Sequence, residues 1–131
     1  MEVPNEAELN WIREHVEATV DFAAQFGITD QRPSVDELDA LWAAWLQIGV
    51  AEDANAVVLM IGLSFGQHLV DDLGLDWVVV SDEHGTEMAV HREEGDVLVF
   101  PPNLVAKRWE TRQTGFLRPV YDEVARLMQT Q

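Results

Sequence analysis

The sequence predicts an α+β fold: three N-terminal helices, a small three-stranded antiparallel meander, then a short helix and a C-terminal helix. Apolar residues recur at helical spacing through the first half of the chain, and after Gly74 they change to the alternating spacing of β-strands. Two turn sequences, at residues 82–85 and 93–96, divide the strand region into three. Because 131 residues suit one domain and no long linker interrupts them, we expect a single domain over residues 1–131.

The first two helices each begin at a predicted capping box. Asn5 precedes Glu8 by three residues, and Ser34 precedes Glu37 by the same spacing. The first helix should end near Gly27 and the second around Gly49. The expected inward positions are Leu9, Ile12, Val16, Val20 and Ala23 in the first helix, and Leu38, Leu41, Trp42, Trp45 and Leu46 in the second.

The third segment, residues 54–70, contains no Asp, Glu, Lys or Arg. Polar residues and two glycines interrupt it and no basic flank adjoins it, which argues against a membrane span. We therefore expect a central core helix, wrapped by the other elements and closed by Gly74. Gly62 and Gly66 lie four residues apart and leave one helix face bare, so another backbone can approach it closely.

The strand region predicts a meander. Residues 76–81 are β-branched and aromatic, residues 86–92 alternate, and residues 97–100 form a third apolar run. The first and third strands are apolar on both faces, so more than one helix should cover the sheet. Prolines 101 and 102 should stop the third strand, with a short helix at residues 104–111 and a C-terminal helix at residues 116–128.

Composition and charge narrow the class of protein. Eight basic and 24 acidic residues give a net charge of −16, which repels phosphate backbones and anionic lipid surfaces. We therefore expect no nucleic acid and no membrane as partner. The chain has no cysteine and an acidic start unlike a signal peptide, which predicts a cytoplasmic location. Both a monomer and a homodimer remain open.

A polar cluster at the end of the core helix is the best catalytic candidate: Gln67, His68, Asp71 and Asp72. His68 and Asp72 are four residues apart and share a helix face, as an acid–base pair or two metal ligands would. A catalytic zinc site needs about three protein ligands, and the spacing indicates no third. We therefore favour a structural histidine bonded to a helix-end carboxylate, and expect no catalytic residue, metal or cofactor.

Two other motifs resemble catalytic or metal-binding sequences but are weaker candidates. Residues 62–66 match the Gly-x-Ser-x-Gly pattern of serine hydrolases, but that serine must stand on a strand-to-helix turn and Ser64 is expected inside a helix. Residues 82–85, Asp-Glu-His-Gly, contain metal-binding types but are typical of a hairpin turn. Neither motif predicts catalysis here.

The tryptophans suggest a binding groove. Trp is enriched both in cores and at interface hot spots, and Trp42 and Trp45 fit the core. Trp77 begins the first strand and Trp109 lies in a basic stretch, where an arginine can stack on the ring. We predict a ligand or partner groove lined by Trp77, His91, Lys107, Arg108 and Trp109, the alternative being that each tryptophan packs in the core.

Residues 54–110 resemble a small bacterial family known as Domain of Unknown Function 3806. The resemblance rests on Gly66-Gln67-His68-Leu69 at the end of an apolar helix, the Trp77 strand, the Gly85 turn, Phe100-Pro101 and Lys107-Arg108. The family favours Glu where this chain has Gln67, so the chain lacks a carboxylate at that position. The resemblance implies a fold but no activity.

Three functions are compatible with the sequence. The first is a non-catalytic binding or protein-interaction module that takes a protein or a small ligand. The second is an acidic, immunity-like inhibitor of a basic toxin or enzyme, whose N-terminal carboxylates steer association. The third is a metal-dependent enzyme that uses His68 and Asp72.

Overall fold

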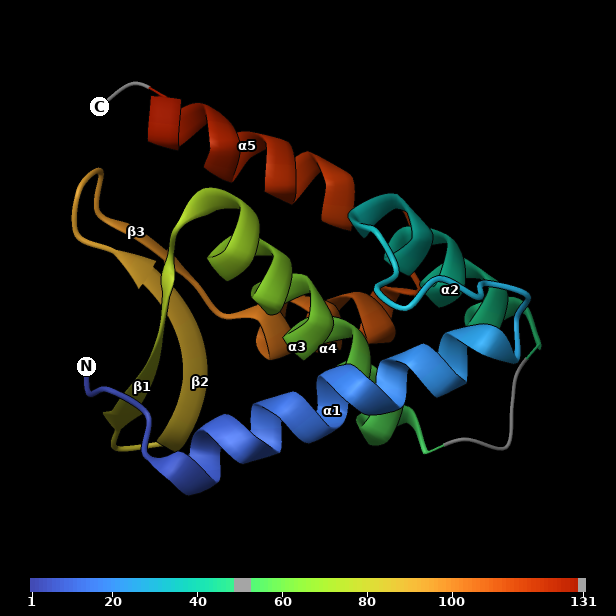
Figure 1. The fold of residues 1–131 in the computed structure, drawn as a ribbon, viewed down its shortest axis with the longest axis horizontal. Coiled ribbons are helices and arrows are strands. Elements are labelled where there is room, and N and C mark those ends of the chain that lie inside the picture. Colours follow the sequence, from blue (N-terminus) through green and yellow to red (C-terminus); the bar gives the residue numbers. More distant parts are fainter. Residues whose placement is uncertain (49–52, 130–131) are drawn as a thin grey trace.

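The structure is a computed structural model, which describes residues 1–48 and 53–129. Its helices and strands follow the predicted order (Figure 1). They are α1 (Glu6–Ala24), α2 (Val35–Ile48), α3 (Ala54–Leu73), β1 (Asp76–Asp82), β2 (Gly85–Arg92), β3 (Val97–Val99), α4 (Pro101–Thr111) and α5 (Leu117–Gln129). The fold is therefore α+β, as predicted, while the expected stop at Gly49 lies outside the described residues.

Both predicted capping boxes are present. In α1 the Asn5 side chain accepts from the backbone N–H of Glu8 at 2.8 Å, and the Asn5 N–H donates to the Glu8 carboxylate at 2.9 Å. Ser34 and Glu37 make the same reciprocal pair ahead of α2, at 3.1 and 2.9 Å. Local sequence thus fixes where these helices begin.

The start of α5 is capped from a distant part of the chain. The carboxylate of Asp39, in α2, accepts from the backbone N–H groups of Leu117 and Arg118, both at 2.9 Å. These N–H groups have no partner within the helix itself, and a carboxylate there also faces the positive end of the helix dipole. Asp39 therefore joins α2 to α5.

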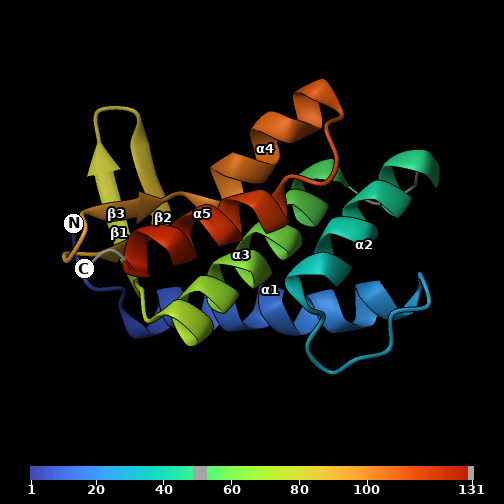
Figure 2. The same ribbon diagram turned by 90° about the horizontal axis from the view of Figure 1, so that it is seen from above.

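Helix α3 is the centre of the fold. It contacts α1, α2, α4, α5 and β2, and Figure 2 shows it between α1 and α4. By length and composition α3 also meets the criterion for a membrane span, but 61% of the apolar window is buried inside the structure. Gly74 ends it in the left-handed conformation, at φ 77°. The burial is that of the core helix that the sequence predicts.

The α3 face that carries Gly62 and Gly66 packs closely against Pro102 and Trp77. A Cβ atom added to Gly62 would lie 2.8 Å from the Cα of Pro102, and one added to Gly66 would overlap the Trp77 ring. Glycine is needed at both positions because any side chain would overlap these atoms. The glycines therefore set how closely α4 and β1 pack on α3.

The sheet is an antiparallel meander in the order β1-β2-β3. Both α3 and α4 contact β2, so more than one helix does pack on the sheet. The outer face is more open than the apolar pattern suggests, because Leu98 of β3 is 42% exposed. Residues Glu2 and Val79 form an isolated bridge that places the N-terminal segment beside β1 (Figure 1).

Two details of the sequence prediction were wrong. Helix α4 begins at Pro101 rather than near residue 104, because proline suits the first helical turn, where its missing N–H costs nothing. Leu9 does not face the core: it is 40% exposed, at the edge of a surface cleft. The buried residues of α1 are Ile12 and Ala23, as predicted, together with Thr19 and Phe22.

We expect Gly62→Ala and Gly66→Ala each to lower the free energy of unfolding by about 1–3 kcal/mol, because the added methyl overpacks a filled interior. In an uncrowded helix the same change raises stability by up to about 1 kcal/mol. Urea denaturation distinguishes the two. A stabilised Gly62→Ala variant would contradict the packing described above, since its clash is with backbone atoms.

Candidate functional site

A surface cleft of about 340 Å³ runs between α1 and α3. We call it the α1–α3 cleft. Its apolar walls come from α1, and Gln67 of α3 and Trp77 of β1 line it as well. Two charged side chains, Arg13 and Glu17, also line it. The lining residues are Leu9, Ile12, Arg13, Val16, Glu17, Gln67 and Trp77.

Gln67 holds the Trp77 ring in place. The indole N–H of Trp77 donates to Oε1 of Gln67 at 3.0 Å, and Nε2 of Gln67 donates to Asp71 at 3.0 Å. Since an indole nitrogen only donates and a carboxylate only accepts, the two bonds fix which way the amide points. A carboxamide is therefore the group that suits this position, because a Glu would face the carboxylate of Asp71.

A second pocket, of about 220 Å³, adjoins the α1–α3 cleft and shares Val16 and Gln67 with it. We call it the His68 pocket. Its apolar lining includes Val20 and Pro33, and its polar lining includes His68 and Ser64. The full lining is Val16, Val20, Gln31, Arg32, Pro33, Ser64, Gln67, His68 and Asp71.

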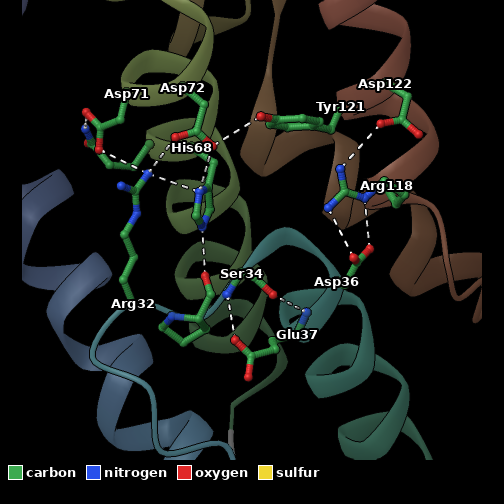
Figure 3. Close-up of polar contacts among 12 residues, drawn as sticks. Arg32, Ser34, Asp36, Glu37, His68, Asp71, Asp72, Arg118, Tyr121 and Asp122 are labelled. Atoms are coloured by element: carbon green, nitrogen blue, oxygen red, sulfur yellow. Dashed lines mark hydrogen bonds and ion pairs between the residues drawn. The ribbon is translucent and has the colours of Figure 1, made fainter.

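Both ring nitrogens of His68 are engaged (Figure 3). Nε2 lies 2.7 Å from the carbonyl oxygen of Pro33, so it carries the proton and donates. Nδ1 lies 3.0 Å from Nη2 of Arg32 and 3.3 Å from Oδ2 of Asp72. His68 itself is 8% exposed. The histidine therefore ties the segment before α2 to α3, as the structural interpretation of this cluster requires.

Arg32 completes the polar cluster. Its Nη2 lies 3.2 Å from Asp71 and 3.4 Å from Asp72, in addition to its contact with His68. The Tyr121 hydroxyl of α5 donates to Asp72 at 3.3 Å, and burial together with that carboxylate raises the pKa of Tyr121. Sequence reasoning missed Arg32, whose only signal is that it is one of two bases before residue 75.

Arg118 extends the polar contacts between α2 and α5 (Figure 3). Its guanidinium forms a two-point pair with Asp36, at 2.9 and 3.2 Å, which lowers the pKa of that carboxyl group. Glu37 has a lowered pKa as well, chiefly because it accepts from the Ser34 N–H. Asp36 is exposed, and its pair with Arg118 joins α2 to α5, whereas the Ser34–Glu37 contact caps α2 locally.

Two other sequence motifs prove structural. Ser64 lies inside α3, and its hydroxyl donates to Thr19 at 2.9 Å, so the Gly-x-Ser-x-Gly match has no strand-to-helix turn. The sequence Asp82-Glu83-His84-Gly85 forms the β1–β2 turn, with the Asp82 side chain accepting from the His84 N–H at 2.7 Å. Within residues 1–48 and 53–129, no three His, Asp or Glu side chains are grouped to hold a metal ion.

The structure separates the predicted groove residues. Trp77 lines the α1–α3 cleft, whereas the Trp109 ring packs on Trp45 and Trp42 of α2, with centroids 5.0 and 6.4 Å away. The Trp77 and Trp109 rings therefore both pack against the core, as the alternative states: Trp77 is 9% exposed, although it also lines the cleft, and Trp109 is partly buried. The arginine over its ring is Arg112, at 4.2 Å.

Lys107 and Arg108 also lie apart from Trp77. Lys107 is exposed on α4, and Arg108 lies over the Phe116 ring at 5.6 Å. Of the predicted set, His91 shares a cleft with Trp77. That cleft, of about 460 Å³, lies beside the N-terminal segment, and we call it the N-terminal cleft.

Together these features define a small α+β protein with a cleft against its central helix and a polar cluster that joins three segments. The chain belongs to the family described as Domain of unknown function (DUF3806), whose model matches residues 37–121, well over half of the chain. The match extends on both sides of the region of resemblance seen in the sequence. No curated protein and no solved structure matches the chain.

We expect Gln67→Glu to lower stability by up to about 1 kcal/mol at pH 7, because two adjacent carboxylates repel. The new carboxyl group then has a raised pKa in the folded state, so the variant loses stability as the pH rises through that pKa. Below about pH 4 the protonated Glu donates to Asp71 and the difference from the parent protein should shrink. Urea denaturation at pH 4 and pH 7 measures both effects.

Gln67→Ala serves as the control, since it removes the amide without adding a charge. Its loss of stability should be the same at both pH values. An equal loss for Gln67→Glu at pH 4 and pH 7 would contradict the contact between Gln67 and Asp71.

Proposed function

We propose that this chain is a non-catalytic binding module whose ligand site is the α1–α3 cleft together with the adjoining His68 pocket. The observation that carries the proposal is the fixed Trp77 ring beside an apolar wall. A largely apolar cleft with a few oriented polar groups is the usual form of a ligand site. The two adjoining volumes, about 340 and 220 Å³, suit a small molecule or the side chains of a partner.

The state of the polar groups supports binding over catalysis. A general base needs a free lone pair within reach of its substrate, whereas His68 donates from Nε2 and meets Arg32 and Asp72 at Nδ1. Ser64 is likewise engaged with Thr19. For the metal-dependent enzyme that uses His68 and Asp72, no further observation offers support. A cytoplasmic location remains part of this proposal, on the composition alone.

The test is a screen of small neutral aromatic fragments by NMR of the ¹⁵N-labelled protein. We expect binders of about millimolar affinity that shift the indole N–H signal of Trp77 and the amide of Gln67. The indole N–H of Trp42, bonded to the carbonyl of Gln113 at 2.8 Å inside the core, should not move and serves as an internal reference.

A variant that fills the proposed site tests whether the fragments bind there. Val16→Phe puts a larger side chain between the cleft and the His68 pocket and should abolish fragment binding. Ala18→Phe adds the same ring to an exposed position of α1 and should leave it intact. Fragments that bind equally well to both variants would show that the site lies elsewhere.

A second candidate function is the acidic inhibitor of a basic toxin or enzyme. The observation that favours it is a row of exposed carboxylates on α1. Among the described residues, Glu14, Glu17 and Asp21 form no ion pair, so their charge is free to attract a cationic partner. The net charge of −16 would add to that attraction at long range.

For a basic protein encoded beside this chain, the inhibitor function predicts an association rate that falls at least about tenfold between 20 and 500 mM salt. Changing Glu14, Glu17 and Asp21 to their amides should slow association at low salt. The control changes the exposed Glu93, Asp96 and Glu110 in the same way. Equal rates for the two triple variants would rule out α1 as the steering surface.

A further inference from the structure

The outer edge of β1 is nearly unpaired. β1 is an edge strand, bonded to β2 on one side. On the other side, among residues 1–48 and 53–129, its backbone pairs with Glu2 alone. The Glu2 N–H donates to the carbonyl of Val79 at 2.9 Å, and the Glu2 carbonyl accepts from the Val79 N–H at 2.8 Å. This bridge is a single residue pair, not a full fourth strand.

Two further residues of β1, Trp77 and Ser81, have backbone groups that point to this outer edge. Along a β-strand, the N–H and C=O groups of alternate residues point to opposite edges. Since those of Val79 point to Glu2, those of Trp77 and Ser81 point the same way. Within the described part of the chain, neither residue has a backbone partner on that side. Pro4, beside Trp77, has no N–H to donate.

A cavity adjoins this edge. The N-terminal cleft, of about 460 Å³, has apolar walls from the N-terminal segment as well as from α1, α3 and β1, and Asp76 and His91 also line it. The apolar lining residues are Val3, Pro4, Leu9, Val70, Trp77 and Val78. A strand paired with β1 would direct alternate side chains toward one face of the sheet, and such pockets give strand addition its specificity. The cleft therefore offers a place for one apolar side chain.

The charge around the edge selects the partner. No Lys or Arg occurs before Arg13 or between Arg32 and Arg92, so β1 and the N-terminal segment carry only acidic charge at neutral pH, apart from histidine and the terminal amine. The edge is flanked by Glu2, Asp76, Asp82 and Glu83. A second copy of the chain, whose net charge is also −16, would be repelled by this edge. A basic strand is the complementary occupant.

We propose that the outer edge of β1 is a strand-addition site for an extended, basic segment of a partner protein. The segment replaces Glu2, pairs with Trp77, Val79 and Ser81, and places an apolar side chain in the N-terminal cleft. This goes beyond the ligand site proposed above, because it uses backbone groups of β1 and requires nothing of the His68 pocket.

The test uses a defined peptide, acetyl-Lys-Val-Lys-Val-Lys-Val-Lys-amide, and amide hydrogen exchange read by NMR. Binding should slow the exchange of the Trp77 and Ser81 amides at least about tenfold, since both gain a hydrogen bond. The amides of Val78 and Val80 already face β2 and should change little. A peptide of equal charge with every backbone nitrogen methylated has no N–H on either edge and should not bind.

Three variants locate the binding. Ser81→Pro removes an outward N–H that has no native partner, and should weaken the peptide at least about tenfold. Ser81→Ala loses the same hydroxyl contact with Thr86 but keeps the N–H, and should bind like the parent protein. Removing residues 1 and 2 should tighten binding, because the competing Glu2 pairing is gone while Val3 of the cleft is kept.

The same measurements can overturn the proposal. Equal binding of the methylated peptide, or equal binding by Ser81→Pro and Ser81→Ala, would show an attraction of charge without strand pairing. A dimer in light scattering, with Trp77 and Ser81 protected before any peptide is added, would make the edge a self-interface. Val16→Phe should retain peptide binding while losing fragment binding, so the failure of one site is separable from that of the other.

Discussion

The Cα of Pro102 lies against Gly62 of α3, and the indole of Trp77 lies against Gly66 one turn later. Because these two glycines have no side chain, α4 and β1 can pack closely on α3, and this sets their positions. The same contact presents Trp77 to the α1–α3 cleft, since its ring rests on Gly66 and its N–H reaches Gln67. Gly66 therefore contributes both to the packing of the core and to the position of a ring that lines the cleft.

The polar cluster has a mechanical role that explains its chemistry. The irregular segment between α1 and α2 passes over α3, and its path is fixed where the Pro33 carbonyl and Arg32 meet His68. Asp72 extends the same contacts to Tyr121 of α5. A histidine that satisfies a buried carbonyl has little freedom to exchange protons with a substrate. His68 and Asp72, which resemble an acid–base pair in the sequence, therefore make contacts that join segments far apart along the chain.

The sequence predicts those features that depend on neighbouring residues. The two capping boxes, the close approach at Gly62 and the β1–β2 turn follow from local chemistry and were correctly identified. The separation of Trp77 from Trp109 could not be predicted, because it depends on how α4 is oriented once Pro101 and Pro102 meet α3, which carries Trp109 onto α2. The start of α4 was readable in principle, since proline is at home in a first helical turn.

The helices also differ in how they are started. Those that begin at Asn5 and Ser34 carry their own caps, whereas α5 depends on Asp39, whose carboxylate binds the Leu117 and Arg118 N–H groups. That dependence gives the chain an order of assembly. As the polypeptide leaves the ribosome, α2 can form early and display its carboxylate, and α5 has its start completed only on docking. The helical content of α5 should therefore form together with the packed core during folding and be lost with it during unfolding.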